Sequence, residues 1–463
     1  MMSNIYENPF SSRYASPEMM DIFSEQHRIG LWRRLWLALA QSEKELGLEI
    51  SDTQINEMQA NLENIDFERA KQYEDELRHD VMAHIHAFGD CCPTARPIIH
   101  LGATSCFVTD NSELIQMHEA LTIIIEKIKI VIKNLCIFAK EYKNLPCLGL
   151  THGQAAQLTT VGKRATLYIQ DLTLDLENLL SLNEKFKLRG AKGTTGTQAS
   201  FLSLFDGDLK KVKELDSLVA KKMGFEKVFP ITSQTYTRKF DYFVLSALSG
   251  IAQSASKFAT DMRLMQSRKE WEEPFGKNQV GSSAMAYKRN PMMSERICAI
   301  SRYLISLPVN SAITASSQWF ERTLDDSANR RIVNSQAFLA ADSILKIMEK
   351  ITAGIVVYPK IIANYVNEEL PFIASENLLM AAVKNGADRQ TAHEIIRKHS
   401  MDAALNVKEN GGSNDFLERI TSDKYFSKYI KEYTEILDPS KYIGCSPSQT
   451  EEYVDYVETR FLN

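Results

Sequence analysis

The feature that most restricts the fold of this chain is the length of its segments without glycine or proline. Residues 103–145, 163–189 and 309–353 contain neither residue. The whole chain has 20 glycines and 13 prolines, 33 of 463 residues or 7%, where average usage is roughly 12%. Because tight turns favour these two residues, a many-turned β protein is disfavoured, as is a collagen-like or disordered chain. We therefore predict an all-α protein built from long helices.

The segment 103–145 shows how such helices pack. Its apolar residues recur at alternating steps of three and four, which places them on one helix face. They are Leu114, Met117, Leu121, Ile124, Ile128, Val131, Leu135 and Phe138. We interpret this stripe as core packing in a bundle, with Asp110 and Glu113 as the N-cap signal at its start. Long helices with apolar seams also associate between subunits, so we expect an oligomer.

Helix-breaking prolines and glycines divide the chain into segments. The helical pattern is interrupted at residues 91–102 and again at Tyr358-Pro359. At about 150 residues per domain, the length also suggests three domains. We predict an N-terminal helical domain (1–106), a central domain formed by a bundle of long helices (107–357), and a C-terminal helical domain (358–463).

Charge and cysteine content limit the partners and the compartment. The net charge is −5, from 54 basic and 59 acidic residues without a one-sign block, which disfavours a broad nucleic-acid or anionic-membrane surface. Seven cysteines without C-x-x-C spacing suggest reduced thiols rather than disulfides or a zinc cluster. No secretory signal and no run of about 18 apolar residues is visible. We expect a cytoplasmic protein without a membrane or nucleic-acid partner.

The stretch 275–296, FGKNQVGSSAMAYKRNPMMSER, is the most informative for chemistry. It combines Gly276, Gly281 and paired serines with Lys288 and other cations between predicted helices. Its composition alone favours a polar connection between helices. Its order of residues favours a flexible loop that brings a hydroxyl, backbone N–H groups and cations to an anion.

Within this stretch, GSSAMAYKRNP resembles the GSSxMPxKxN signature of the fumarase/aspartase superfamily, whose lyases eliminate fumarate from substituted succinates. Ala286 stands where the signature has proline, and no catalytic group changes. Six further segments narrow the resemblance to the adenylosuccinate lyase family, in its animal-type branch. They are SRYAS (12–16), RHDVMAHIHA (78–87), GATSCFVTDN (102–111), THGQ (151–154), SQTYTRK (233–239) and FERTLDDSANRR (320–331).

The resemblance implies an all-helical three-domain subunit, a homotetramer with active sites assembled from three chains, and no cofactor. It also implies the substrate: adenylosuccinate, cleaved to AMP and fumarate, and the related succinyl-aminoimidazole-carboxamide ribotide. Adenylosuccinate carries two carboxylates and a phosphate, so its site needs several cations and backbone donors. A local cluster of cations would then exist within a chain whose net charge is only mildly negative.

Elimination of fumarate requires one group to remove a proton next to a carboxylate and another to protonate the leaving nitrogen. By the resemblance, Ser282 is the base and His152 the acid, while His79 orients His152 or the phosphate. Lys288 and backbone N–H groups are candidates to stabilise the Ser282 alkoxide. We interpret the other two histidines of the segment RHDVMAHIHA, His84 and His86, as structural. The sequence has no H-E-x-x-H spacing that would suggest a metal site.

The resemblance also implies a set of substrate-binding residues. Thr104 and Ser105, which follow the glycine of GATSCFVTDN, would bind a succinyl carboxylate. The residues of FERTLDDSANRR would bind the phosphate. The set is Arg13, Tyr14, Arg78, His79, Asp80, Thr104, Ser105, Thr151, Gln234, Arg296, Arg322, Ser327 and Arg331.

Two alternatives stay open. The loop would also suit a sister lyase that acts on argininosuccinate, malate or aspartate, although the second and last motifs favour a nucleotide. A lyase fold can also be reused as a catalytically silent scaffold, and fold alone does not exclude this. A scaffold predicts damaged acid–base positions, whereas Ser282, His152 and His79 are all present.

Overall fold

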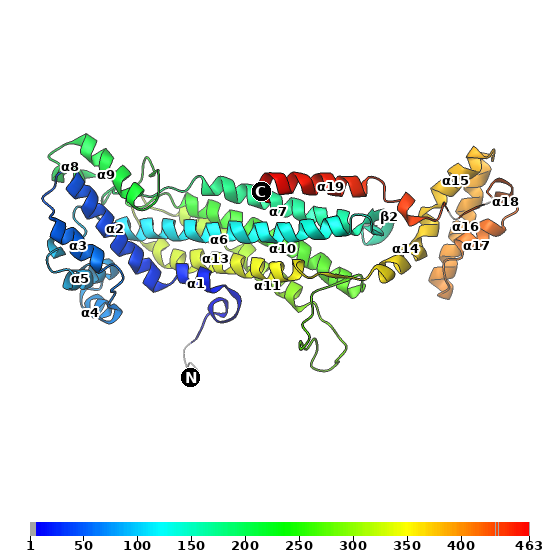
Figure 1. Cartoon of the computed structure of the whole chain (residues 1–463), viewed down its shortest axis with the longest axis horizontal. Coiled ribbons are helices and arrows are strands. Elements are labelled where there is room, and N and C mark those ends of the chain that lie inside the picture. Colours follow the sequence, from blue (N-terminus) through cyan, green and yellow to red (C-terminus); the bar gives the residue numbers. More distant parts are fainter. Residues whose placement is uncertain (1–5, 431, 434, 463) are drawn as a thin grey trace. The chain divides into compact units, whose positions relative to one another are not determined.

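The computed structural model of the chain describes residues 6–430, 432–433 and 435–462, which are mostly helical (Figure 1). This confirms the predicted all-α class, to which the structure adds two small antiparallel sheets. The chain divides into two compact units. The first unit comprises residues 1–128, 174–256 and 297–347, and the second comprises 129–173, 257–296 and 348–463. The three-domain division stays a prediction.

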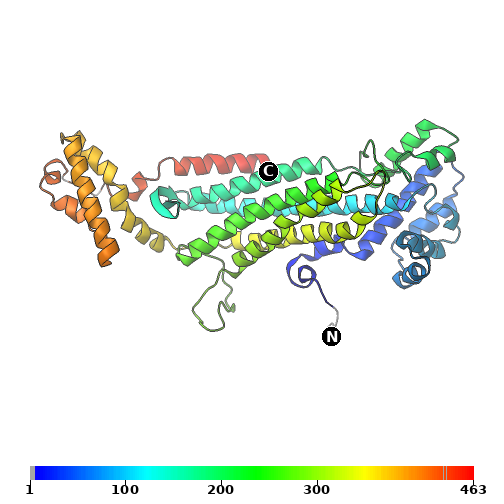
Figure 2. The same ribbon diagram turned by 180° about the vertical axis from the view of Figure 1, so that it is seen from behind.

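Five long helices contribute residues to both units and are seen from opposite sides in Figures 1 and 2: α6 (Ser105–Glu141), α7 (Val161–Asn183), α10 (Lys239–Ser267), α11 (Met292–Ser306) and α13 (Asp325–Thr352). The other helices of the first unit are α1 (Pro17–Ile22), α2 (Glu25–Glu45), α3 (Asp52–Ala60), α4 (Phe67–Leu77), α5 (Asp80–Cys91), α8 (Ala199–Leu204), α9 (Leu209–Lys222) and α12 (Pro308–Ser316). The second unit adds α14 (Pro359–Ile373), α15 (Ser375–Lys384), α16 (Arg389–Asn410), α17 (Phe416–Ser422), α18 (Phe426–Tyr429), α19 (Ser446–Val457), and strands β1 (Pro146–Thr151), β2 (Gln154–Thr160), β3 (Trp271–Glu272) and β4 (Val356–Val357).

The stretches without glycine and proline mostly became long helices. Helices α6 and α7 occupy the first two, and all eight residues of the predicted stripe on α6 are 0–6% exposed. The third stretch was wrongly predicted as continuous, because residues 317–324 separate α12 from α13. Asp110 was wrongly predicted as an N-cap: α6 begins at Ser105, so Asp110 lies inside the helix, where it is buried.

Polar pairs between the long helices fix their packing inside each unit. In the first unit, Ser254 of α10 donates to Asp175 of α7 across 2.6 Å. In the second unit, Tyr168 of α7 donates to Asp261 of α10 across 2.8 Å. Because buried polar groups need partners, these pairs favour one register of the helices over its neighbours.

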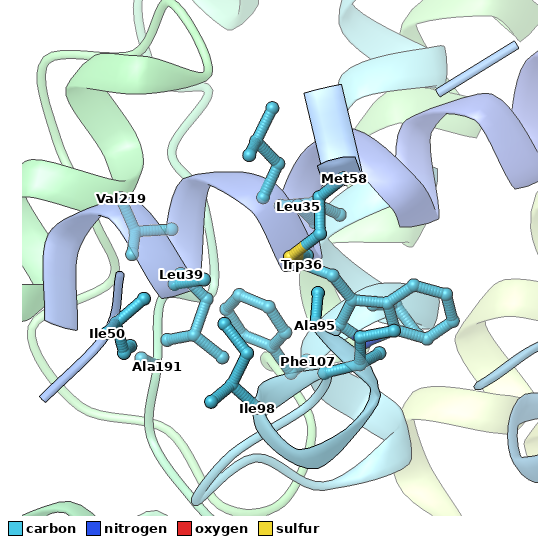
Figure 3. Close-up of a cluster of buried hydrophobic side chains, with 14 of the residues drawn as sticks. Leu35, Trp36, Leu39, Ile50, Met58, Ala95, Ile98, Phe107, Ala191 and Val219 are labelled. Carbon is cyan, nitrogen blue, oxygen red and sulfur yellow. The ribbon is translucent and has the colours of Figure 1, made fainter. Parts of the chain in front are cut away.

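The largest described core of the first unit surrounds α2, and Figure 3 shows part of it. Trp36 and Leu39 of α2 lie among side chains from α3, α6 and α9, including Phe107 and Val219. The buried indole N–H of Trp36 donates to His100 Nδ1 at 2.8 Å, which satisfies its only polar atom. This packing fixes the start of α6 against α2, and both helices reach the site described below.

The second unit contains a β-hairpin that the sequence analysis did not predict. Strands β1 and β2 pair antiparallel, with a two-residue turn formed by His152 and Gly153. Both turn residues have positive φ, 54° and 73°, as a type I′ turn requires. A separate small core of α15–α18 is centred on Phe416, Ile420 and Phe426.

The structure bears on two further expectations from the sequence, the absence of a long apolar run and the reduced state of the cysteines. The stretch Met292–Ser316, which covers α11 and α12, is long and apolar enough to cross a membrane by length and composition. A single such stretch is weak evidence, because core helices pass the same test. All seven cysteines are free thiols.

Glu43 of α2 provides a test of the N-terminal core. It is fully buried and neither carboxyl oxygen has a hydrogen-bond partner among the described residues. Burial raises its pKa from 4.5 to about 9. Because the folded pKa lies above the unfolded one, Glu43 costs stability increasingly as the pH rises from 4.5 toward 9.

We expect Glu43→Gln to raise the free energy of unfolding by on the order of 1–3 kcal/mol at pH 7, and by less at pH 5. Urea unfolding at both pH values measures this. The matched control is Glu45→Gln on the same helix, where an exposed carboxylate pairs with Lys222 at 2.6 Å and should contribute little. A pH-independent effect at Glu43 would contradict the assignment.

Candidate active site

A polar cavity of about 620 Å³ lies in the first unit. It is walled by α2, by the junction of α4 and α5, by the start of α6, and by residues 234–238 and 322–331. Eight of the residues proposed from the sequence line it: Arg78, His79, Asp80, Ser105, Gln234, Arg322, Ser327 and Arg331. The structure therefore gathers side chains from four of the quoted motifs around one space.

Two arginines lie at the junction of α4 and α5: Arg78 belongs to the junction itself, and Arg331 reaches it from α13. Arg78 ends α4 in the left-handed conformation, with φ 54°, and its guanidinium has no ion-pair partner among the residues that the structure describes. Arg331 of α13 donates to Asp80 at 2.7 Å. Burial alone would raise the pKa of Asp80. The hydrogen bond and charge of Arg331, the backbone N–H of Val81 and the nearby His79 together outweigh burial and hold that pKa below its ordinary value.

His79 is held by the helix that follows it. Its Nδ1 accepts the backbone N–H of Met82 at 3.3 Å, so the side chain N-caps α5. A neutral imidazole that accepts at Nδ1 carries its proton on Nε2. That Nε2 lies 3.5 Å from Ser105 Oγ, at the cavity wall. His79 thus presents an N–H donor to the cavity.

Behind the cavity lies a buried ion-pair network. Arg238 donates Nε to Asp326 at 2.7 Å and both terminal nitrogens to Asp110 at 3.1 Å. The second Asp326 oxygen accepts from Arg322 at 2.7 Å. Arg238, Asp110 and Asp326 are all buried, so each charge depends on these partners. The network fixes the guanidinium of Arg322 at the cavity.

A neighbouring network holds Arg330, which donates to Asp241 at 2.6 Å and lies 2.7 Å from Glu113 Oε2. Burial raises the pKa of Glu113.

Sequence reasoning missed several cavity residues, although most of them lie inside or next to the quoted motifs: Arg28, Trp32, Asp110, Glu113, Arg238, Asp326 and Arg330. Arginine and aspartate together in one motif were a usable signal, because buried charges need opposite partners.

Three predicted binding residues of this unit do not line the cavity: Arg13, Tyr14 and Thr104. Arg13 and Tyr14 lie in a single short helical turn, Phe10–Tyr14. Directly after this turn, hydrogen bonds connect the chain to the long helices α6 and α13. The backbone N–H of Ser16 donates to buried Asp342 at 2.6 Å, and Lys127 of α6 bonds the same carboxylate.

The second unit holds the other predicted residues: Thr151, His152, Ser282, Lys288 and Arg296. Thr151 and His152 lie at the exposed tip of the β1–β2 hairpin. Arg296 lies on α11. Within the described part of this unit, no hydrogen bond joins His152 to Ser282.

Ser282 and Lys288 lie on the exposed loop 274–291. Ser282 Oγ accepts the backbone N–H groups of Ala284 at 3.3 Å and Met285 at 3.1 Å. Two N–H donors aimed at one oxygen favour its anionic form. Gly281 is required here, because a Cβ at this position would lie 2.2 Å from the Lys288 carbonyl oxygen.

The cavity of the first unit, with its cations and hydroxyls, suits a ligand with several anionic groups. In the second unit, the two N–H donors at Ser282 suit a reaction that needs a stabilised oxyanion, and the exposed hairpin tip presents a histidine. In the part of the chain that the structure describes, no group of three His, Cys, Asp or Glu residues is arranged to hold a metal ion.

Comparison with known proteins gives a consistent match. The profile of a family described as Lyase matches residues 12–305, and that of the adenylosuccinate lyase C-terminus matches 371–453. The chain is 54% identical over 452 residues to the adenylosuccinate lyase of Saccharomyces cerevisiae (97% of this chain, 94% of that protein). Over the same shares it is 48% identical to that of Schistosoma mansoni. To that of Pyrococcus abyssi it is 32% identical (97% of this chain, 98% of that protein).

Solved structures share the fold. The 3-carboxy-cis,cis-muconate lactonizing enzyme from Pseudomonas putida superposes with a TM-score of 0.84 at 20% identity, covering 98% of this chain and 100% of that chain. A fumarate lyase from Mesorhizobium sp. BNC1 gives 0.81 at 21% identity, covering 97% and 99%. At such identities the likeness is one of fold alone.

The buried and the exposed ion pairs at the cavity predict losses of stability of different size. Asp326→Asn should lower the free energy of unfolding by about 3–5 kcal/mol, because it leaves two buried or half-buried guanidinium groups short of a charge. Arg331→Met breaks a pair that is partly exposed on both sides, and should cost about 1 kcal/mol or less. Urea unfolding of the two variants measures the difference. Equal losses would mean that the cavity has no rigid wall behind it.

Proposed function

The chain belongs to the adenylosuccinate lyases of the fumarase/aspartase superfamily, and from this membership we propose how its own residues carry out the reaction. It is a lyase that cleaves adenylosuccinate to AMP and fumarate in purine biosynthesis. The observation that ties this activity to the molecule is the gathering of Arg78, Arg322 and Arg331 around one cavity. A substrate with two carboxylates and a phosphate needs such a set of cations.

In the proposed mechanism Ser282, as its alkoxide, removes the proton next to the succinyl carboxylate. The N–H groups of Ala284 and Met285 support this role, because they stabilise negative charge on Oγ. The C–N bond then breaks, and His152 donates a proton to the leaving purine nitrogen. Lys288 is proposed as a further cation near the alkoxide.

The remaining residues bind the substrate. We assign Ser327, Arg322 and Arg331 to the phosphate, and Thr104 and Ser105 to a succinyl carboxylate. His79 would donate its Nε2–H to an acceptor of the substrate, which orients rather than protonates it. Arg13, Tyr14, Arg78, Asp80, Thr151, Gln234 and Arg296 complete the proposed set.

We propose a homotetramer whose active sites combine residues from three subunits. Exposed apolar side chains on the long helices support an oligomer, among them Leu174 of α7 and Phe243 of α10. The exposed hairpin tip with His152 and the exposed loop with Ser282 support sharing, because exposed segments are accessible to another copy.

Three finer assignments are also proposals. The second substrate is the succinyl-aminoimidazole-carboxamide ribotide, which carries the same succinyl group and phosphate. Membership of the animal-type branch is supported by the identity to the Schistosoma mansoni protein. A cytoplasmic location is supported by the seven free thiols, which suit a reducing compartment.

The base is tested by Ser282→Ala with Ser283→Ala as the neighbouring control. We expect fumarate release from adenylosuccinate to fall about 10²–10⁴-fold in the first variant, because a positioned base is lost. His152→Gln should lose a similar factor. The measurement is kcat at saturating adenylosuccinate. Near-normal turnover in Ser282→Ala, or a larger loss at Ser283, would reject the assignment.

Sharing of sites is tested by mixing two inactive variants. If His152 and Ser282 of one site come from different subunits, coexpressed His152→Gln and Ser282→Ala chains will form some sites with both residues intact. We expect activity to return in the coexpressed oligomer and in neither variant alone. A mixed tetramer without activity would show that one subunit supplies both residues.

A further inference from the structure

The loop that carries Ser282 is closed at its base by two buried side chains that no motif contains. The loop leaves α10 through β3 and returns to α11, so residues 273 and 289–294 are its two ends. Gln266 belongs to the last turn of α10, and Glu273 is the first residue after β3. Both side chains are buried.

Gln266 bonds both ends of the loop at once. Its Oε1 accepts the backbone N–H of Glu273 at 3.2 Å, at the start of the loop. Its Nε2 donates to the Arg289 carbonyl oxygen at 2.9 Å, near the end of the loop. A side-chain amide is suited to this, because it has one acceptor and one donor side in a fixed plane.

Glu273 makes a second bridge between the same two ends. Its carboxylate accepts the backbone N–H groups of Ser294 at 2.5 Å and Met293 at 3.1 Å. These are orphan donors of the first turn of α11, and a carboxylate there is favoured by the helix dipole. The cap of α11 therefore comes from the opposite end of the loop.

Two contacts lead from this base to Ser282. Asn290, next to the Gln266-bonded carbonyl, donates its side-chain N–H to the Gly281 carbonyl oxygen at 2.9 Å. The backbone at Gly281 packs so closely on Lys288 that no side chain would fit. Ser282 thus follows directly on a residue that is tied to the base of the loop.

We propose that Gln266 and Glu273 are positioning residues that brace the loop 274–291 and so hold Ser282 in place for proton removal. This rests on the proposed role of Ser282. Neither side chain contacts the reacting atoms. They act by keeping the two loop ends at one separation, from which Asn290 and Gly281 fix the position of the Ser282 backbone.

The test is Gln266→Met, which keeps the size of the side chain and removes both bonds. We expect kcat for adenylosuccinate cleavage to fall roughly 10–100-fold, since small misplacements of a catalytic group have effects of this size. KM should change much less, because the cavity cations are unaltered. Amide hydrogen exchange should accelerate within 274–291 and at the start of α11, but not along α10.

The matched control is Gln253→Met on the same helix, where the amide bonds the carbonyl and hydroxyl of Ser249 and no other group among the described residues. It should leave kcat and loop exchange unchanged. Glu273→Gln is the milder second variant: it keeps one acceptor oxygen, so it should retain more activity than Gln266→Met while still exposing the first amides of α11 to exchange.

Ser282→Ala measured in parallel separates the two ideas. If Ser282→Ala keeps its turnover, the proposed base is wrong, and the exchange data alone then judge the brace. If Ser282→Ala is inactive, but Gln266→Met and Glu273→Gln match the Gln253→Met control in kcat and in loop exchange, the brace is overturned. Faster loop exchange with unchanged kcat would also overturn it, because the loop would then not need bracing for catalysis.

Discussion

The contact on which the binding cavity most depends is the buried guanidinium of Arg238 between the carboxylates of Asp110 and Asp326. A charge in this position is costly unless all its hydrogen bonds are met, so the three residues permit one arrangement of their backbones. Asp110 belongs to α6 and Asp326 to the first turn of α13. The pairing therefore fixes where α13 starts, and with it the places of Arg322, Ser327 and Arg331 at the cavity.

This network also explains the two errors of the sequence analysis in this region. Asp110 followed by Glu113 has the pattern of a helix start, yet Asp110 lies about one and a half turns inside α6. Its carboxylate pairs with Arg238 and accepts the backbone N–H of Tyr236, so it does not cap the start of its own helix. The stretch 309–353 lacks helix breakers, yet it is interrupted at 317–324. Helix propensity is a weak preference per residue, and a buried ion pair at Asp326 outweighs it. Local patterns could not reveal that Arg238 pairs with Asp110 and Asp326, which lie 128 and 88 residues away from it.

Other parts could be predicted because their cause is local. The stripe from Leu114 to Phe138 determines the buried face of α6 by spacing alone. The candidate residues were identified by motif order, and eight of them meet at one cavity. The hairpin at His152 was missed, although a His-Gly pair between apolar stretches is compatible with a type I′ turn. The bonds of Gln266 and the cap supplied by Glu273 depend on tertiary structure and leave no pattern in the sequence.

The proposed binding and catalytic groups are therefore held in two different ways. Arg322 needs a fixed position, and a buried network behind it supplies one at the cost of burying charge. Ser282 sits on an exposed loop, where a network of that kind would have no protein interior around it. Its alkoxide would be stabilised by the loop's own N–H groups instead, and these work only if the backbone keeps its shape. A brace at the base of the loop meets this need without covering the hydroxyl, so the loop can remain open to substrate while its ends stay in register.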